Sequence, residues 1–117
     1  MWGIGTDLVE ISRVVHWTDD ADMLTQVFTT EERKAAMSVK YPHRRLAVFF
    51  AVKEAFMKAI GTGWGDGVVW QDIEARIDGR RVYLRLYGRA AELCNGRRVF
   101  ASACCSEGLA LATVVLD

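Results

Sequence analysis

The sequence predicts an α+β fold in which a small antiparallel sheet packs on one long helix. Three observations indicate this class: the first residues suit a strand, residues 42–60 suit a long helix, and the chain after residue 67 mostly alternates apolar and polar side chains. Helices and strands therefore fall in separate stretches of the chain, as they do in α+β proteins. At 117 residues, the chain is expected to form one domain, residues 1–117.

The first strand is expected over residues 2–11, where a short apolar run is loosened by Gly3 and Gly5. Asp7 lies inside this strand, where aspartate is disfavoured, and the glycines before it leave room for a ligand or another backbone. Asp7 is therefore a candidate charged site. The alternative is that Asp7 ends the strand and caps a helix that begins near Ile11.

Two short helices are expected next. Residues 19–27 have an acidic start and helical spacing of their apolar residues. Thr29 and Glu32 have the spacing of a capping box, in which each side chain accepts a hydrogen bond from the other residue's backbone N–H. A helix should follow this box and end before Tyr41-Pro42.

The long helix is expected to begin at Pro42, the only proline, and to run through Ile60 into a glycine-containing turn. Lys53, Glu54 and Lys58 interrupt its apolar residues. Because ionised groups leave water at a cost of several kcal/mol unless they are compensated, this charged group is a candidate site. The alternative is an exposed stripe in which Glu54 and Lys58 form an i,i+4 pair worth roughly 0.2–0.5 kcal/mol.

The remainder of the chain is expected to form two hairpins separated by a short helix. The first hairpin alternates apolar and polar residues and turns at Asp78-Gly79, whereas the second is expected to be buried. The expected strands cover residues 68–78, 80–88, 99–105 and 109–117, and the short helix covers residues 89–94.

Asp7 and Glu54 are carboxylates on two elements that should pack against each other. Such a pair suits Mg²⁺, which takes one or two protein oxygens and completes its octahedron with water and substrate phosphates. Lys53, Lys58 and the turn at residues 61–63 would then neutralise or cradle phosphates.

Composition limits the partners and the location. Fifteen basic residues balance fifteen acidic ones, which argues against a nucleic-acid partner. We find no apolar window of membrane-spanning length and no signal peptide, so we expect a cytoplasmic protein without a membrane partner. Cys94, Cys104 and Cys105 lack disulfide or zinc spacing and are expected to be reduced. The apolar content and the small sheet favour a homo-oligomer.

Four segments together resemble the holo-acyl-carrier-protein synthases, the short trimeric phosphopantetheinyl transferases. They are GIGTDLVEISR, FTTEE, FAVKEAFMKAIGTG and GVVWQDIE, and the match stays in register from Gly3 to Leu116. The resemblance implies transfer of phosphopantetheine from coenzyme A to a serine of apo acyl carrier protein, with Mg²⁺ as the metal. It also implies a homotrimer whose active sites lie between neighbouring subunits.

The resemblance further implies roles for single residues. Metal ligation falls on Asp7 and Glu54, and a catalytic role falls on Lys53. The candidates to accept the proton of the attacking serine are Glu54, a metal-bound water and Glu32. The positions expected to bind the coenzyme are Lys58, Gly61, Thr62 and Gly63.

Three places depart from the family pattern. Val48-Phe49 replaces a Gly-Arg pair whose cation is expected to face the coenzyme phosphates, and Cys104-Cys105 replaces the last two residues of Ser-x-Ser-His. Arg81 replaces a turn proline and has little chemical weight. Coenzyme A is therefore expected to bind more weakly than in a typical relative, unless Arg44 or Arg45 supplies the phosphate contacts. The alternative is a pocket repurposed for another small-molecule biosynthetic reaction or for ligand binding.

Overall fold

The computed structural model describes residues 1–61 and 63–117 and confirms the α+β class. In chain order its elements are β1 (Gly3–Glu10), α1 (Ile11–Trp17), α2 (Ala21–Val27), α3 (Thr30–Met37), α4 (Pro42–Ile60), β2 (Ile73–Asp78), β3 (Arg81–Leu86), α5 (Gly88–Cys94), β4 (Val99–Ser106) and β5 (Leu109–Leu116). Short 3₁₀ turns cover Gly63–Asp66 and Trp70–Asp72.

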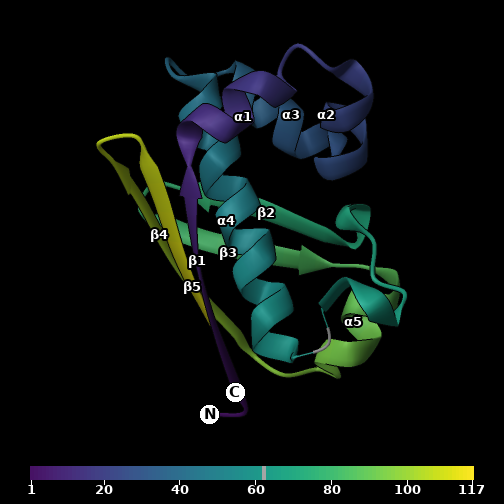
Figure 1. Ribbon diagram of the computed structural model, residues 1–117. Coiled ribbons are helices and arrows are strands. Elements are labelled where there is room, and N and C mark those ends of the chain that lie inside the picture. Colours follow the sequence, from purple (N-terminus) through teal and green to yellow (C-terminus); the bar gives the residue numbers. More distant parts are fainter. Residues whose placement is uncertain (62) are drawn as a thin grey trace.

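One antiparallel sheet, in the order β1-β5-β4-β3-β2, curves around α4 (Figure 1). β5 pairs with β1 and with β4 along its whole length, whereas the register between β3 and β4 consists of Val82 opposite Ala101. Figure 1 accordingly shows β2 and β3 crossing the other strands at a steep angle. The sheet thus has two parts, and α4 packs mainly on the inner face of β1 and β5.

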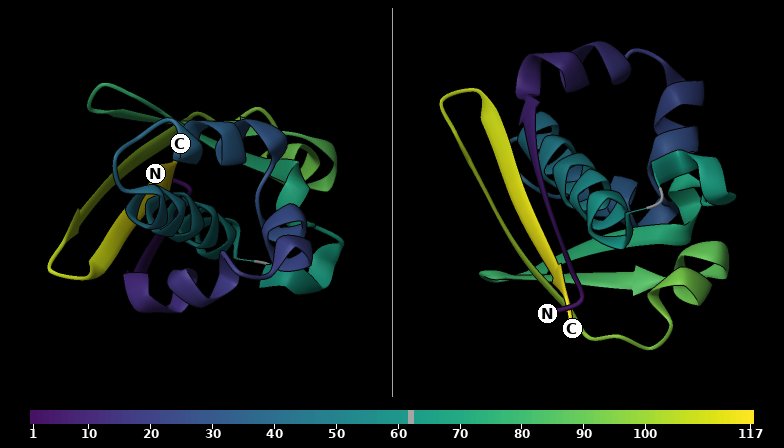
Figure 2. Two further views of the ribbon diagram at one scale, coloured as in Figure 1. Left: turned by 90° about the horizontal axis from the view of Figure 1, so that it is seen from above. Right: turned by 60° about the horizontal axis from the view of Figure 1, so that its bottom comes forward.

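α4 is the centre of the core, as the sequence predicts. Pro42 occupies its first turn, and Gly61 ends it in the left-handed conformation with φ of 77°, which glycine adopts without steric cost. Most of its side chains from Leu46 to Ile60 are buried. The two views in Figure 2 show the sheet along one side of α4 and the short helices α1 to α3 around its first half. The sheet and the short helices therefore fix the position of α4, and with it the position of any functional residue on α4.

Two expectations about strands are wrong. The strand expected from residue 68 begins at Ile73, because a 3₁₀ turn precedes it in which the Asp72 carboxylate accepts a hydrogen bond from the Val69 N–H at 3.3 Å. The terminal hairpin is buried only in part: alternate residues of β5 are buried, but no residue of β4 is. The cause is that α4 covers only the inner face of these strands. Among the residues described, no helix has both the length and the apolar character needed to cross a bilayer.

Candidate active site at the seam between β1 and α4

The inner face of β1 approaches α4 very closely. Gly3, Gly5, Asp7 and Val9 share this face, while the residues between them are exposed. A Cβ atom on Gly5 would lie 2.6 Å from the Ala59 backbone nitrogen, so only glycine permits this approach. Asp7 therefore lies in the middle of β1 and faces α4. The alternative, in which Asp7 caps the following helix, is wrong, because Glu10 occupies the N-cap position of α1.

Asp7 forms an ion pair with Lys58 across the seam. The Lys58 ammonium donates to Asp7 Oδ1 at 2.9 Å and to the Thr6 carbonyl at 3.0 Å. The Asp7 side chain is 13% exposed and that of Lys58 is 53% exposed. The pair therefore sits at the edge of the core, where the lysine can also meet a ligand from solvent.

Glu54 lies on the same side of α4 as Lys58, one helical turn earlier, and it is half-buried. Gly3 lies against Ala59 and Gly5 against Ala55, so β1 advances toward the start of α4 as its sequence proceeds. Asp7, the next residue of the inner face, contacts Lys58, which follows Glu54 by one helical turn. The joint action of the two carboxylates remains a prediction.

These two carboxylates fit Mg²⁺ better than a metal that needs a full protein cage. Within residues 1–61 and 63–117, no cluster of three or more His, Cys, Asp or Glu side chains is placed to hold a metal ion. Mg²⁺ requires only one or two carboxylates when substrate phosphates and water complete its shell. Lys58 lies beside them as a cation for the same phosphates.

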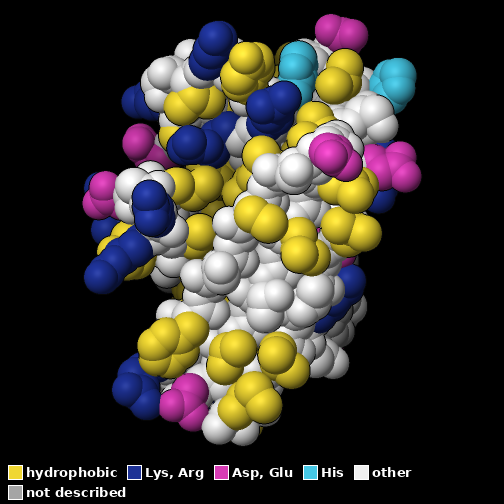
Figure 3. Space-filling model, turned by 90° about the vertical axis from the view of Figure 1, so that its left-hand side faces the viewer, with side chains coloured by type: hydrophobic (Ala, Val, Ile, Leu, Met, Phe, Trp, Pro, Cys, Tyr) yellow, Lys and Arg dark blue, Asp and Glu magenta, His cyan; other side chains and the backbone are white. Residues whose placement is uncertain are grey.

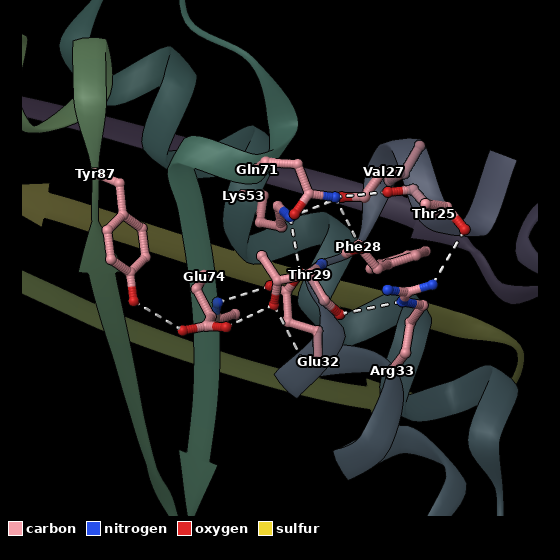
Figure 4. Close-up of polar contacts among 11 residues, drawn as sticks. Thr25, Val27, Phe28, Thr29, Glu32, Arg33, Lys53, Gln71, Glu74 and Tyr87 are labelled. Atoms are coloured by element: carbon pink, nitrogen blue, oxygen red, sulfur yellow. Dashed lines mark hydrogen bonds and ion pairs between the residues drawn. The ribbon is translucent and has the colours of Figure 1, made fainter. Parts of the chain in front are cut away.

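Lys53 projects from a different side of α4 and is part of a buried network (Figure 4). Lys58 follows it by five positions, which places the two lysines about 140° apart around the helix at 3.6 residues per turn. The Lys53 ammonium donates to Glu32 Oε1 at 2.8 Å and to the Val27 carbonyl at 2.7 Å. Both charged side chains are 0% exposed.

Glu32 joins three elements through this network. Its Oε1 also accepts the Thr29 N–H at 2.8 Å, and its Oε2 accepts the Ala75 N–H of β2 at 2.7 Å. The Thr29 hydroxyl accepts the Glu32 N–H at 3.2 Å, which confirms the predicted capping box. The same hydroxyl donates to Glu74 at 2.6 Å. Lys53 and Glu32 thus tie α4 to the start of α3 and to β2.

Burial dominates the electrostatics of this pair. Desolvation raises the pKa of Glu32 and lowers the pKa of Lys53, and the attraction between the two charges opposes both shifts. Both oxygens of Glu32 accept hydrogen bonds, and neither side chain is exposed. The direct catalytic contacts expected of Lys53 and Glu32 are therefore out of reach of a substrate at the surface.

Comparison with known proteins identifies the chain. The family model of the 4′-phosphopantetheinyl transferase superfamily matches residues 3–114. The chain belongs to this superfamily. Among its relatives are the holo-[acyl-carrier-protein] synthases of Syntrophotalea carbinolica, 39% identical over 98% of this chain and 94% of the relative, and of a Geobacter species, 36% identical over 100% and 98%.

Solved structures of holo-[acyl-carrier-protein] synthases have the same fold. The enzyme from Neisseria meningitidis is 31% identical with a TM-score of 0.86, and the alignment covers 100% of this chain and 98% of that one. The enzyme from Bacillus anthracis, in complex with coenzyme A (3′,5′-ADP), is 34% identical with a TM-score of 0.81 over 98% and 95%. The predicted resemblance to the phosphopantetheinyl transferases is confirmed.

Three of the positions that depart from the family pattern, Val48, Cys104 and Cys105, line one hollow near the start of α4. A hollow of about 330 Å³ there is lined by residues that include Lys40, Arg44, Arg45, Val48, Cys104 and Cys105. Phe49 does not line it: the ring is 1% exposed in the core, so the expectation that position 49 faces the coenzyme phosphates does not fit this structure. The Arg45 guanidinium lies 5.9 Å from the centre of the Phe49 ring.

The turn after α4 is described only in part. Gly61 ends the helix and Gly63 begins a 3₁₀ turn, while Thr62 lies outside the described residues. The predicted phosphate contacts of this turn remain a prediction. The pairing of Asp7 with Lys58 and the grouping of Lys40 with the two cysteines were not predicted from the sequence. The pairing of Asp7 with Lys58 could have been predicted, because Gly3, Gly5 and Asp7 occupy alternate positions of a strand and therefore share one face.

Proposed function

We propose that the protein transfers phosphopantetheine from coenzyme A to a serine hydroxyl of an apo acyl carrier protein. The observation that carries this proposal is the ion pair of Asp7 with Lys58, one helical turn from Glu54, in a chain that matches holo-[acyl-carrier-protein] synthases over its whole length. The repurposed pocket has no comparable support. The expected cytoplasmic location also suits the reduced state of the three cysteines.

The residues at the seam suit an in-line displacement at phosphorus. The serine oxygen would attack the β-phosphorus of coenzyme A as the bond to 3′,5′-ADP breaks. Held by Asp7 and Glu54, Mg²⁺ would supply positive charge for the phosphoryl oxygens. Lys58, half-exposed beside Asp7, would donate to the same oxygens. Glu54 is our candidate to accept the serine proton.

Lys53 and Glu32 have a positioning role in this proposal. Their buried hydrogen bonds fix the rotation of α4 about its own axis, and that rotation sets the direction in which the neighbouring Glu54 points. Gly61 to Gly63 remain candidates for phosphate contacts. Arg45 lies thirteen residues before Lys58, about 20 Å along the helix at 1.5 Å per residue, so the two cations serve different phosphates.

Loss of either carboxylate should nearly abolish transfer. We expect Asp7→Asn and Glu54→Gln each to slow the reaction by about a hundredfold, because several kcal/mol of charge stabilisation depend on the metal and each 1.36 kcal/mol is a factor of ten. The measurement is the mass of an apo carrier protein incubated with coenzyme A, Mg²⁺ and each variant. Glu31→Gln, at an exposed carboxylate of α3, is the control and should keep full activity. Transfer that survives both substitutions or excess chelator would exclude this site.

We propose that the protein is a homotrimer and that the outer face of β1, β5 and β4 forms the interface. Leu8 pairs with Leu111, which pairs with Cys104, and these three side chains are exposed together. The Thr6 and Thr113 hydroxyls, 3.2 Å apart, form the adjacent row. Figure 3 shows apolar side chains gathered over this side of the molecule. An apolar face of this kind favours burial against another subunit.

Charge on this face should separate the subunits. We expect Leu8→Arg to give monomers of 13.1 kDa, because an unpaired buried cation opposes association, while the unchanged chain has three times that mass. Sedimentation equilibrium at micromolar concentration makes the measurement. Met37→Arg, which changes an exposed apolar residue of α3, should leave the mass unchanged. A monomeric unchanged chain would contradict the proposal.

A further inference from the structure

We propose that Lys58 keeps Mg²⁺ from binding tightly at Asp7 until the phosphates of coenzyme A take over its ammonium. Mg²⁺ should therefore bind weakly to the protein alone and tightly in the presence of the coenzyme. The inference rests on the transferase function proposed above, and it adds the order in which the site is assembled. It concerns binding, so it can be tested without any turnover.

The Lys58 ammonium links α4 to β1 through two hydrogen bonds. It donates to Asp7 Oδ1 at 2.9 Å and to the carbonyl oxygen of Thr6, the preceding residue of the strand, at 3.0 Å. The Asp7 side chain is 13% exposed, and a carboxylate that is largely removed from water needs a counter-charge or hydrogen bonds. Lys58 supplies both, so any other cation at Asp7 competes with an existing partner.

A second cation at Asp7 would lie close to the Lys58 ammonium. Two cations that contact one carboxylate are within a few ångströms of each other, and like charges repel more strongly at the edge of a protein core than in bulk water. Mg²⁺ also gives up its hydration shell reluctantly, so a carboxylate that binds it must be available. We therefore expect the ion pair to weaken the binding of Mg²⁺ by the protein alone.

The Lys58 side chain can change partners, because it is 53% exposed and carries a compact charge on a flexible four-carbon stem. Lys53 on the same helix cannot: it is 0% exposed, and its ammonium donates to Glu32 and to the Val27 carbonyl inside the core. A ligand at the surface of the seam can therefore attract Lys58 without disturbing the buried pair.

The phosphates of coenzyme A are such a ligand. Their oxygens can accept hydrogen bonds from the ammonium and can also complete the Mg²⁺ shell, so their negative charge offsets the repulsion between the two cations. The coenzyme and Mg²⁺ should then strengthen each other's binding by the same factor, because coupling between two ligands is reciprocal. Couplings of this kind are typically about 5–150-fold.

Calorimetric titration with Mg²⁺, with and without saturating coenzyme A and in the absence of carrier protein, measures this coupling. In the unchanged chain, we expect coenzyme A to tighten Mg²⁺ binding by about tenfold or more. Lys58→Met removes the charge and keeps a long side chain. It should tighten the binding of Mg²⁺ alone by about fivefold and reduce the effect of coenzyme A by a similar factor. Lys58→Arg, which keeps the charge, should bind Mg²⁺ alone no more tightly than the unchanged chain.

Lys34→Met is the matched control, because it also removes one positive charge from an ion pair. Lys34 lies 3.8 Å from Glu31 on α3, with both side chains mostly exposed, and salt screens such surface charges, so Mg²⁺ binding should change by less than about twofold. Labelling of lysine amines with an N-hydroxysuccinimide ester, followed by peptide mapping, reports on the unchanged chain itself. Saturating Mg²⁺ should speed the labelling of Lys58, whose amine leaves its two acceptors, and should not affect Lys34.

Tighter binding of Mg²⁺ by Lys58→Met, together with faster labelling of Lys58 in the unchanged chain, supports the proposal. Unchanged or weaker Mg²⁺ binding by this variant, or labelling of Lys58 that does not respond to Mg²⁺, overturns it. The proposed function then stands if transfer to the carrier protein still needs Mg²⁺ and Asp7. If Asp7→Asn also binds Mg²⁺ as tightly as the unchanged chain, the metal site at Asp7 is excluded together with this inference.

Discussion

Lys53→Met should lower the free energy of unfolding by about 3–5 kcal/mol, because it leaves the Glu32 carboxylate buried without its counter-charge. The Val27 carbonyl also loses the ammonium that donates to it. Denaturant unfolding of the variant and the unchanged chain makes the comparison. A loss below 1 kcal/mol would show that the pair contributes little to stability.

An exposed ion pair provides the matched control for Lys53→Met. Lys34 and Glu31 lie 3.8 Å apart on α3 with both side chains mostly exposed, so Lys34→Met should change stability by less than about 0.5 kcal/mol. The double variant Lys53→Met/Glu32→Leu should recover only part of the loss. It removes the buried charges, but the N–H groups of Thr29 and Ala75 lose their acceptors, at about 1–3 kcal/mol each.

Gly5→Ala should cost about 3 kcal/mol of stability and most of the transferase activity. The added Cβ would overlap the Ala55 carbonyl oxygen and lie 2.6 Å from the Ala59 nitrogen, and both are backbone atoms of a packed helix. Overpacking of this kind typically costs about 1–3 kcal/mol, and β1 must move away from α4 to relieve it. Asp7 lies two residues further along the strand, so the same movement separates it from Lys58.

Gly65→Ala is the matched control for Gly5→Ala, because no atom lies within 4 Å of the Cβ it would add and its φ is not in the left-handed range. Its stability should stay within about 0.5 kcal/mol of the unchanged chain. Thermal unfolding and the carrier-protein assay should be run on both variants. If Gly5→Ala is as stable and active as Gly65→Ala, the close approach of β1 to α4 is not needed for the site.

The local elements were largely predictable from the sequence. Pro42 and the glycine after Ile60 mark the ends of α4, and the spacing of Thr29 and Glu32 marks the start of α3. These signals are local, because proline fixes φ, glycine permits the left-handed turn, and a capping box closes within four residues. The strand expected from residue 68 was wrong because Trp70–Asp72 form a 3₁₀ turn, in which the Asp72 side chain accepts a hydrogen bond from the Val69 N–H.

By itself, the sequence determined the fold class, the family resemblance and the pair of carboxylates, Asp7 and Glu54, on neighbouring elements. Only the tertiary structure separated the two lysines of α4: Lys53 is fully buried with Glu32, while Lys58 is half-exposed beside Asp7. The physical reason is that helical spacing fixes the angle between two side chains but not which side the rest of the chain covers. Here β2 and the start of α3 cover Lys53, and β1 leaves Lys58 at the edge.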